Sequence, residues 1–90
     1  MLTLVHVTQR NIDEGEAKNC KHCPVALALR PHVVPSTGIT VDGEDVTFFN
    51  GGDIAVSSRL PHKAICFVAD FDMGRYVKPF VFEMDIPPGY

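Results

Sequence analysis

The residues best suited to chemistry are two cysteines three positions apart, in the segment Cys20-Lys21-His22-Cys23-Pro24. A thiol at the start of a helix feels the positive end of the helix dipole, which lowers its pKa and favours the reactive thiolate. The same pair, with His22 between its members, could also contribute ligands to a zinc site. The spacing therefore raises two hypotheses, a thiol-redox pair and a metal site.

The surrounding sequence supports neither hypothesis well. A polar segment precedes Cys20 where a redox fold would place a strand, and the proline follows the pair instead of lying inside it. A structural zinc site needs a second ligand pair, which is missing here. The simpler interpretation is that Cys23 begins a helix with its side chain in the core and that Cys66 is a small buried hydrophobe. We therefore expect no metal and no cofactor, and keep Cys20, Cys23 and His22 as the metal candidates.

The four histidines do not complete a catalytic set. Histidine titrates near neutral pH, but a histidine base needs an orienting partner and a nucleophile within hydrogen-bond reach. No Ser or Cys lies in a nucleophile-elbow pattern, and no spacing pairs a His with an Asp. We expect His6 and His62 to be exposed or locally hydrogen-bonded. The sequence therefore predicts a protein that is not an enzyme.

The first third of the chain predicts one strand and two short helices. Residues 2–7 alternate with branched apolar side chains, as in a strand. A surface helix over residues 9–14 is expected, with Thr8 as its N-cap and Gly15 as a left-handed residue after its end. The apolar run 24–30 begins with a proline, which favours the first position of a helix, although such a run could also form a buried strand.

The middle of the chain predicts three short strands in a meander, over residues 38–57. The first turn, residues 42–45, contains Asp-Gly, a good hairpin former. The second turn, residues 50–53, has two glycines that could be mistaken for a phosphate loop. It leads into a strand and not into a helix N-terminus, so we interpret it as a hairpin turn.

The last third predicts a helix followed by a strand. Pro61 marks the helix start, with Ser57 or Ser58 as its cap and Gly74 as the residue after its end. Between them, apolar residues recur at helical spacing. Residues 80–86 alternate between apolar and acidic or branched side chains, which is typical of a strand with one core face.

Taken together, these patterns predict a single α+β domain over residues 1–90. We expect a small, mainly antiparallel sheet of four to five strands with two or three helices on one face. The apolar fraction of 46% is enough for a core, and no apolar run is long enough to span a membrane. The first residues lack the pattern of a secretory signal, so a cytoplasmic protein with reduced thiols is expected.

The charged residues argue against a nucleic-acid partner. The net charge is −3, and the eight Lys and Arg residues are scattered singly instead of clustered. Arg59, Lys63 and Arg75 could contact phosphate groups, but no motif joins them. They leave open an alternative in which the protein binds or sequesters a nucleotide or another small molecule.

The aromatic residues give the positive hypothesis for function. Phe49, Phe67, Tyr76 and Tyr90 fall outside the expected inward face, and exposed aromatic residues are enriched at protein interfaces. They predict an interaction surface for a protein partner or for a second copy in a homodimer. The alternative, that these rings belong to the core, stays open at this point.

Three segments resemble a group of small uncharacterised proteins from bacteriophages and actinobacterial genomes. They are residues 6–15, 23–29 and 71–82, which match a V-T-x-x-x-I-x-x-G start, a C-P-V-A-L-A-L helix and an F-D-x-G-x-x-V-x-P-F-x-F end. Residues 31–58 match poorly, and the lone cysteine of the group corresponds to Cys23. The resemblance implies an accessory protein of phage or prophage that acts in a bacterial cytoplasm, and it implies no activity.

The sequence as a whole thus predicts a non-enzymatic accessory or regulatory protein that binds a protein of the bacterial host or a second copy of itself. Two alternatives are a thiol-redox or zinc-binding protein that uses Cys20 and Cys23, and a protein that sequesters a nucleotide or small molecule.

Overall fold

The computed structural model describes residues 2–50 and 54–90 of the chain. Its elements, in order, are β1 (Leu2–Val7), α1 (Gln9–Glu14), α2 (Pro24–Leu29), a 3-10 turn η1 (Arg30–His32), β2 (Thr37–Val41), β3 (Asp45–Asn50), β4 (Ile54–Arg59), α3 (His62–Asp72) and β5 (Phe80–Asp85). The predicted α+β class is confirmed. None of the helices in this part of the chain has the length and apolar character that crossing a bilayer requires.

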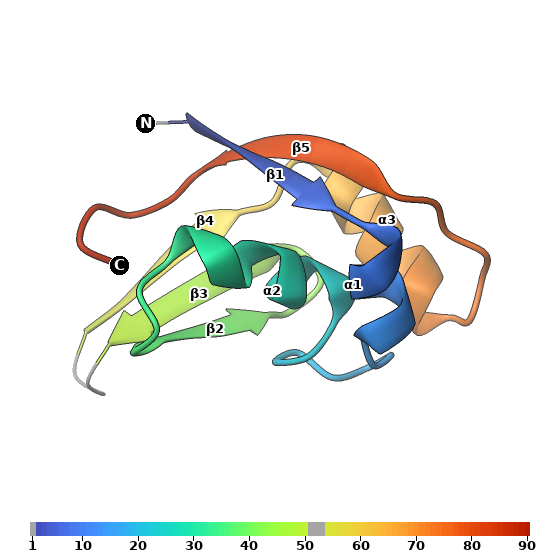
Figure 1. Cartoon of the computed structure of the whole chain (residues 1–90), viewed down its shortest axis with the longest axis horizontal. Helices are drawn as coiled ribbons and strands as arrows, with labels where there is room; N and C mark the ends of the chain where they lie inside the picture. Colours follow the sequence, from blue (N-terminus) through green and yellow to red (C-terminus); the bar gives the residue numbers. More distant parts are fainter. Residues whose placement is uncertain (1, 51–53) are drawn as a thin grey trace.

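The strands are all paired antiparallel, as expected, and they divide into two sheets. β1 pairs with β5, which joins two distant parts of the chain, with Leu2 opposite Asp85 and Val7 opposite Phe80. β2, β3 and β4 form the predicted meander. Figure 1 shows the two-stranded sheet lying over the three-stranded one.

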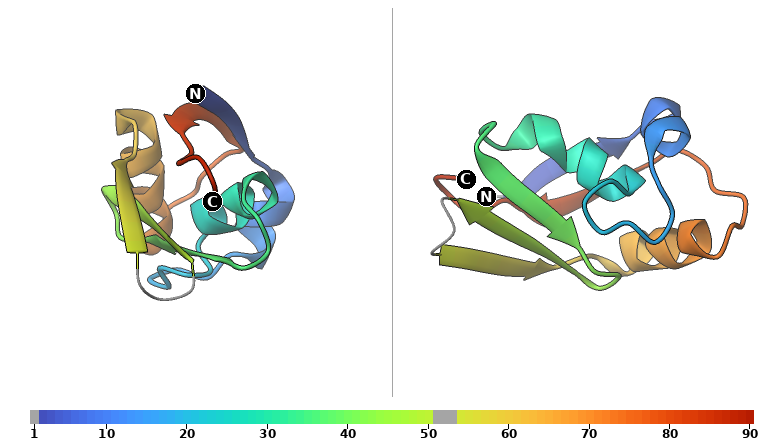
Figure 2. Two further views of the ribbon diagram at one scale, coloured as in Figure 1. Left: turned by 90° about the vertical axis from the view of Figure 1, so that its left-hand side faces the viewer. Right: turned by 90° about the horizontal axis from the view of Figure 1, so that it is seen from below.

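The helices α2 and α3 both contribute buried side chains to the core. Figure 2 shows α2 and α3 on opposite flanks of the molecule, so that sheets and helices enclose one core. α2 contacts both β1 and β2 and is buried along most of its length. The core includes residues from both sheets and from the helices, among them Val5, Val7, Val25, Leu29, Val41, Val46, Phe48, Val68 and Phe82.

Hydrogen bonds at its first turn stabilise the short helix α1. Thr8 and Asn11 form a capping box, in which Asn11 N–H donates to Thr8 Oγ1 at 3.2 Å and Thr8 N–H donates to Asn11 Oδ1 at 2.9 Å. The expectation that Gly15 is left-handed is wrong, because its backbone is extended. Gly15 is instead closely packed, since a Cβ there would lie 2.7 Å from the Pro24 ring.

The helix α3 ends as predicted but begins differently. Gly74 has a φ of +76°, and the carbonyl groups of Phe71 and Asp70 accept from the N–H groups of Gly74 and Arg75. This pattern is a Schellman motif, which closes the last turn of a helix. Pro61 is the N-cap residue. The predicted serine caps are wrong, because the hydrogen bonds of strand β4 extend through Ser57 and Ser58 to Arg59.

The β2–β3 hairpin has the predicted turn. Asp42 Oδ1 accepts from Asp45 N–H at 2.8 Å, and Gly43 is left-handed with a φ of +97°. The second predicted turn, at residues 50–53, lies largely outside the described residues. The inward face of the meander is confirmed for Ile39, Val41, Val46 and Phe48, which are all buried.

Candidate functional site

Cys23 is the N-cap of α2, and its thiol is buried. Its Sγ accepts from Ala26 N–H at 3.4 Å, and the residue is 3% exposed. Burial raises the pKa of the Cys23 thiol, and this effect exceeds the opposing hydrogen bonds from the Ala26 and Val25 amides. The expected lowering by the helix dipole therefore does not hold, and Cys23 is a protonated core residue at neutral pH.

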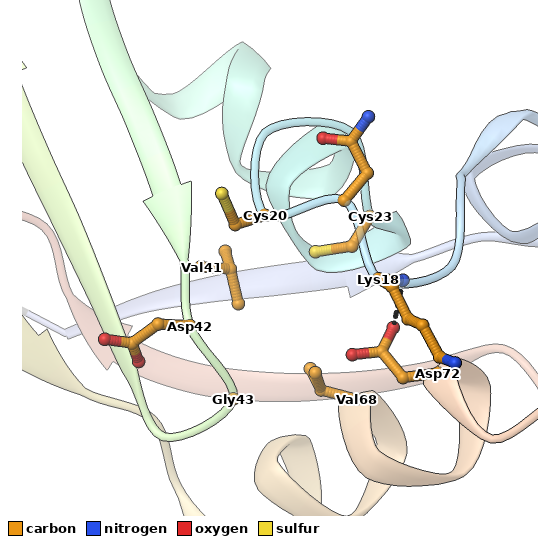
Figure 3. Close-up of a pocket in the computed structure, with 9 residues that line it drawn as sticks. Lys18, Cys20, Cys23, Val41, Asp42, Gly43, Val68 and Asp72 are labelled. Carbon is orange, nitrogen blue, oxygen red and sulfur yellow. Dashed lines mark hydrogen bonds between the residues drawn. The ribbon is translucent and has the colours of Figure 1, made fainter.

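Cys20 is exposed, and its main chain has a structural contact. Its carbonyl accepts from Val41 N–H at 2.8 Å, which ties the 16–22 loop to the end of β2. Figure 3 shows the sulfur atoms of Cys20 and Cys23 turned in different directions. All three cysteines are free thiols.

A cavity of about 210 Å³ lies beside this pair (Figure 3). It opens between the loop before α2, the β2–β3 turn and the end of α3, and its lining consists of Lys18, Asn19, Cys20, Cys23, Val41, Asp42, Gly43, Val68 and Asp72. Asp72 is engaged, since its Oδ1 accepts from Lys18 N–H at 2.9 Å. The exposed His22 does not line the cavity.

The predicted metal candidates are not brought together. Within residues 2–50 and 54–90, no three side chains from His, Cys, Asp and Glu are arranged to hold a metal ion. This segment gathers no ligand set because its side chains lie in different environments. The thiol of Cys23 is buried, whereas the side chain of His22 is exposed.

The three predicted anion contacts are also separate. Arg59 lies 3.9 Å from Glu44, and Arg75 lies 3.3 Å from Asp70. Lys63 lies in the first turn of α3 and Arg75 follows its last turn, and the helix between Lys63 and Asp72 is about 14 Å long at 1.5 Å per residue. These three cations therefore do not form one binding site.

Only one of the four predicted surface aromatics is strongly exposed. Tyr76 is 84% exposed, whereas Phe67 is 7% exposed and its ring lies tilted against that of Phe80 with centroids 4.7 Å apart. The surface prediction for Phe67 is wrong, because α3 turns this position toward the core. Phe49 covers Gly38, where an added Cβ would overlap the Phe49 ring. Tyr90 packs against the core, and its carbonyl accepts from Val34 N–H and Thr37 Oγ1.

Sequence reasoning missed a thiol–imidazole pair on α3. Cys66, expected to be buried, is exposed, and its Sγ lies 3.4 Å from His62 Nε2. The i, i+4 spacing of the two residues on a predicted helix is the signal that could have found it, because such residues lie on one face.

The outer edges of the strands differ in how they are closed. The edge of β2 is covered at both ends, because Val41 N–H donates to Cys20 and the Arg30 guanidinium donates to the Thr37 carbonyl. β5 lies between Pro79 and Pro87 and carries Glu83 and Asp85. Charged side chains and prolines are the usual means by which proteins block edge-to-edge pairing.

The edge of β1 lacks these features. In the described part of the chain, the backbone of β1 pairs with β5 on one side and with nothing on the other. The strand contains no proline, acidic residue, lysine or arginine. Leu2 and Leu4 are 63% and 51% exposed, so the strand presents apolar side chains next to an open edge.

Comparison with models of known protein families, with curated proteins and with solved structures finds no match to this chain. The resemblance to phage and actinobacterial proteins therefore stays a prediction.

Proposed function

We propose that this chain is a non-enzymatic accessory protein that acts by protein–protein binding through the edge of β1. The observation that carries the proposal is the combination of an unpaired, uncharged strand edge with the exposed Leu2 and Leu4. Such an edge is a template for pairing with another strand. The resemblance to phage proteins supports an accessory or regulatory role in a bacterial cytoplasm.

The partner that fits this edge is β1 of a second copy. Identical strands pair antiparallel about a two-fold axis, which makes the contact self-complementary. If Leu4 lies at the axis, opposite Leu4 of the second copy, then Leu2 lies opposite His6. No two like charges of fixed sign meet across this pairing, and the two sheets join into one of four strands.

The size of the edge sets the expected affinity. β1 has six residues, so the pairing buries less than the roughly 1,200 Å² that a standard stable interface needs. We therefore expect a reversible dimer with a dissociation constant in the micromolar range, about −8 kcal/mol. Such a dimer leaves the edge available to a strand of another protein at low concentration.

Sedimentation equilibrium of the purified protein tests the proposal. The wild type is expected to show a concentration-dependent monomer–dimer equilibrium. Leu4→Lys places two like charges opposite each other and is expected to weaken the dimer about tenfold or more. Ala55→Lys, at an exposed position of β4, is the matched control and should leave the equilibrium unchanged.

Two results together would contradict the use of this edge. They are a wild type that stays monomeric at high concentration, and equal capture of bacterial lysate proteins by the wild type and by Leu4→Lys. Equal weakening by Leu4→Lys and Ala55→Lys would also contradict it, because the effect would then follow net charge alone.

A further inference from the structure

A groove of about 410 Å³ runs between α3 and the segment that leads into β5. One wall is the face of α3 that carries Lys63, Cys66, Phe67 and Asp70, and the other is the segment 76–80. Its volume falls within the roughly 300–1,000 Å³ of small-molecule sites. No residue of β1 lines this groove.

The interior of the groove is apolar. Phe67 and Phe80 form its base, with ring centroids 4.7 Å apart, and Val77 and Pro79 complete that side. Tyr76 stands at the rim, 84% exposed. A wall of this composition favours an aliphatic or aromatic group over a polar one, because burial of apolar surface is the main gain available.

The rim carries positive charge. Lys63 and Lys78 both line the groove. In the part of the chain that the structure describes, neither lysine has a carboxylate partner, while Asp70 is engaged by Arg75 at 3.3 Å. Two unpaired ammonium groups beside an apolar groove suit a ligand that joins an apolar group to an anionic one.

A nucleophile stands at the same place. Cys66 lines the groove, and His62 Nε2 lies 3.4 Å from its Sγ. A thiol within hydrogen-bond reach of an imidazole can pass its proton to the imidazole as it attacks an electrophile. The other thiols lack this arrangement, since Cys20 has no imidazole contact in the described residues and Cys23 is buried.

We propose that Cys66 is an S-acylation site that accepts an apolar acyl group from an acyl thioester with an anionic carrier. The Cys66 sulfur attacks the thioester carbonyl while His62 takes the thiol proton. A bond forms between Sγ and the acyl carbon, the bond from that carbon to the carrier sulfur breaks, and the carrier thiolate receives the proton from His62. The acyl chain lies in the groove, and Lys63 and Lys78 face the carrier.

Intact-mass measurement with peptide mapping tests this assignment. The folded protein is incubated with hexanoyl-coenzyme A, with the neutral hexanoyl thioester of N-acetylcysteamine, or with acetyl-coenzyme A. We expect one hexanoyl group on Cys66, formed faster than on Cys20, and faster transfer of hexanoyl than of acetyl. His62→Gln is expected to slow acylation of Cys66 about a hundredfold, the lower end of the range for loss of a general base.

Two further variants separate the groove from general thiol reactivity. The double variant Lys63→Gln, Lys78→Gln should reduce the preference for the anionic over the neutral donor, whereas Lys21→Gln, beside Cys20, should not. Circular dichroism checks that each variant is folded. Equal acylation of Cys20 and Cys66, or a rate that His62→Gln leaves unchanged, would overturn the proposal. Neither outcome depends on dimerisation, so this test and that of the β1 edge fail separately.

Discussion

The strands β1 and β2 are both sheet edges, but the chain treats them differently. Two hydrogen bonds close β2. Val41 N–H donates to the Cys20 carbonyl, and the Arg30 guanidinium donates to the Thr37 carbonyl. β1 has no such contact outside its ladder with β5 in the described residues, and it exposes Leu2 and Leu4. An edge that needs no partner is usually blocked, so the unblocked edge of β1 is a place where binding is expected.

The closed edge of β2 also shows a structural role for the segment that contains Cys20 and Cys23. The Cys23 side chain is fixed in the core, and the adjoining loop presents the Cys20 carbonyl to β2. The C-x-x-C segment therefore closes a sheet edge. The Cys20 carbonyl satisfies the Val41 N–H group, which would otherwise point to solvent or to another chain.

The largest effect is expected when the closed edge is opened. Arg30→Ala removes a charged donor from the carbonyl groups of Val34 and Thr37, which should lower the free energy of unfolding by about 1.5–3 kcal/mol. It should also create association that Leu4→Lys does not abolish. Urea unfolding and sedimentation measure the two effects. Arg10→Ala, at an exposed ion pair on α1, is the control and should change neither.

The next effect concerns the exchange of backbone amides. Raising the protein concentration should slow hydrogen exchange of the outward amides of β1 about tenfold, equivalent to about 1.4 kcal/mol, because pairing buries them. The amide of Val41 is already bonded to Cys20 and should not respond to concentration. Exchange measured by mass spectrometry at two concentrations checks this, and equal slowing of both edges would remove the distinction between them.

A smaller effect depends on pH. The pKa of Cys23 is raised in the folded protein, so the native state holds its proton more tightly than the unfolded chain. Stability from this group is complete below the ordinary thiol pKa of 9.0 and is lost as the pH rises through the folded pKa. The difference in unfolding free energy between wild type and Cys23→Ala should therefore shrink above that pH, by at most about 1.4 kcal/mol per pH unit.

Urea unfolding at a series of alkaline pH values measures this difference. Cys20→Ser, which leaves the main-chain contact in place, is the matched control and should run parallel to the wild type. A constant difference between the wild type and Cys23→Ala across the series would show that the Cys23 thiol is not held protonated by the fold.

The smallest effect is expected at the end of β4. Arg59 and Glu44 lie 3.9 Å apart with exposed side chains, so Arg59→Gln should change the free energy of unfolding by less than about 0.5 kcal/mol. Thermal unfolding at low and high salt measures this. A loss above about 1 kcal/mol would mean that an ion pair, and not side-chain packing, holds this edge.

Local elements of the fold could be predicted from the sequence because they depend on local patterns. The alternation of residues 2–7 and the Asp-Gly turn at 42–43 identify strands and a hairpin. Gly74 marks the end of α3 for the same reason, since only glycine takes its φ of +76° without strain. These signals reside within a few neighbouring residues, and the structure reproduces them.

The arrangement of the edges could not be predicted in this way. Whether β1 is open depends on its pairing with residues 80–85, and whether β2 is closed depends on Cys20 lying beside Val41. The burial of Phe67 and the exposure of Cys66 also reverse the places that the sequence predicts for them. Their places are set by which face of α3 meets the core, and neighbouring helix positions are separated by about 100°.

The most direct test of the open edge is oxidation of a Leu4→Cys variant in a Cys20→Ser, Cys66→Ser background. Antiparallel pairing about Leu4 brings the two Cβ atoms to about 4.5–5.5 Å, close to the reach of a disulfide. A disulfide-linked dimer is therefore expected on mild oxidation, while Thr40→Cys on the closed strand β2 stays monomeric. Pairing through the β1 edge is contradicted if Leu4→Cys yields no disulfide-linked dimer, or if Thr40→Cys yields as much dimer as Leu4→Cys.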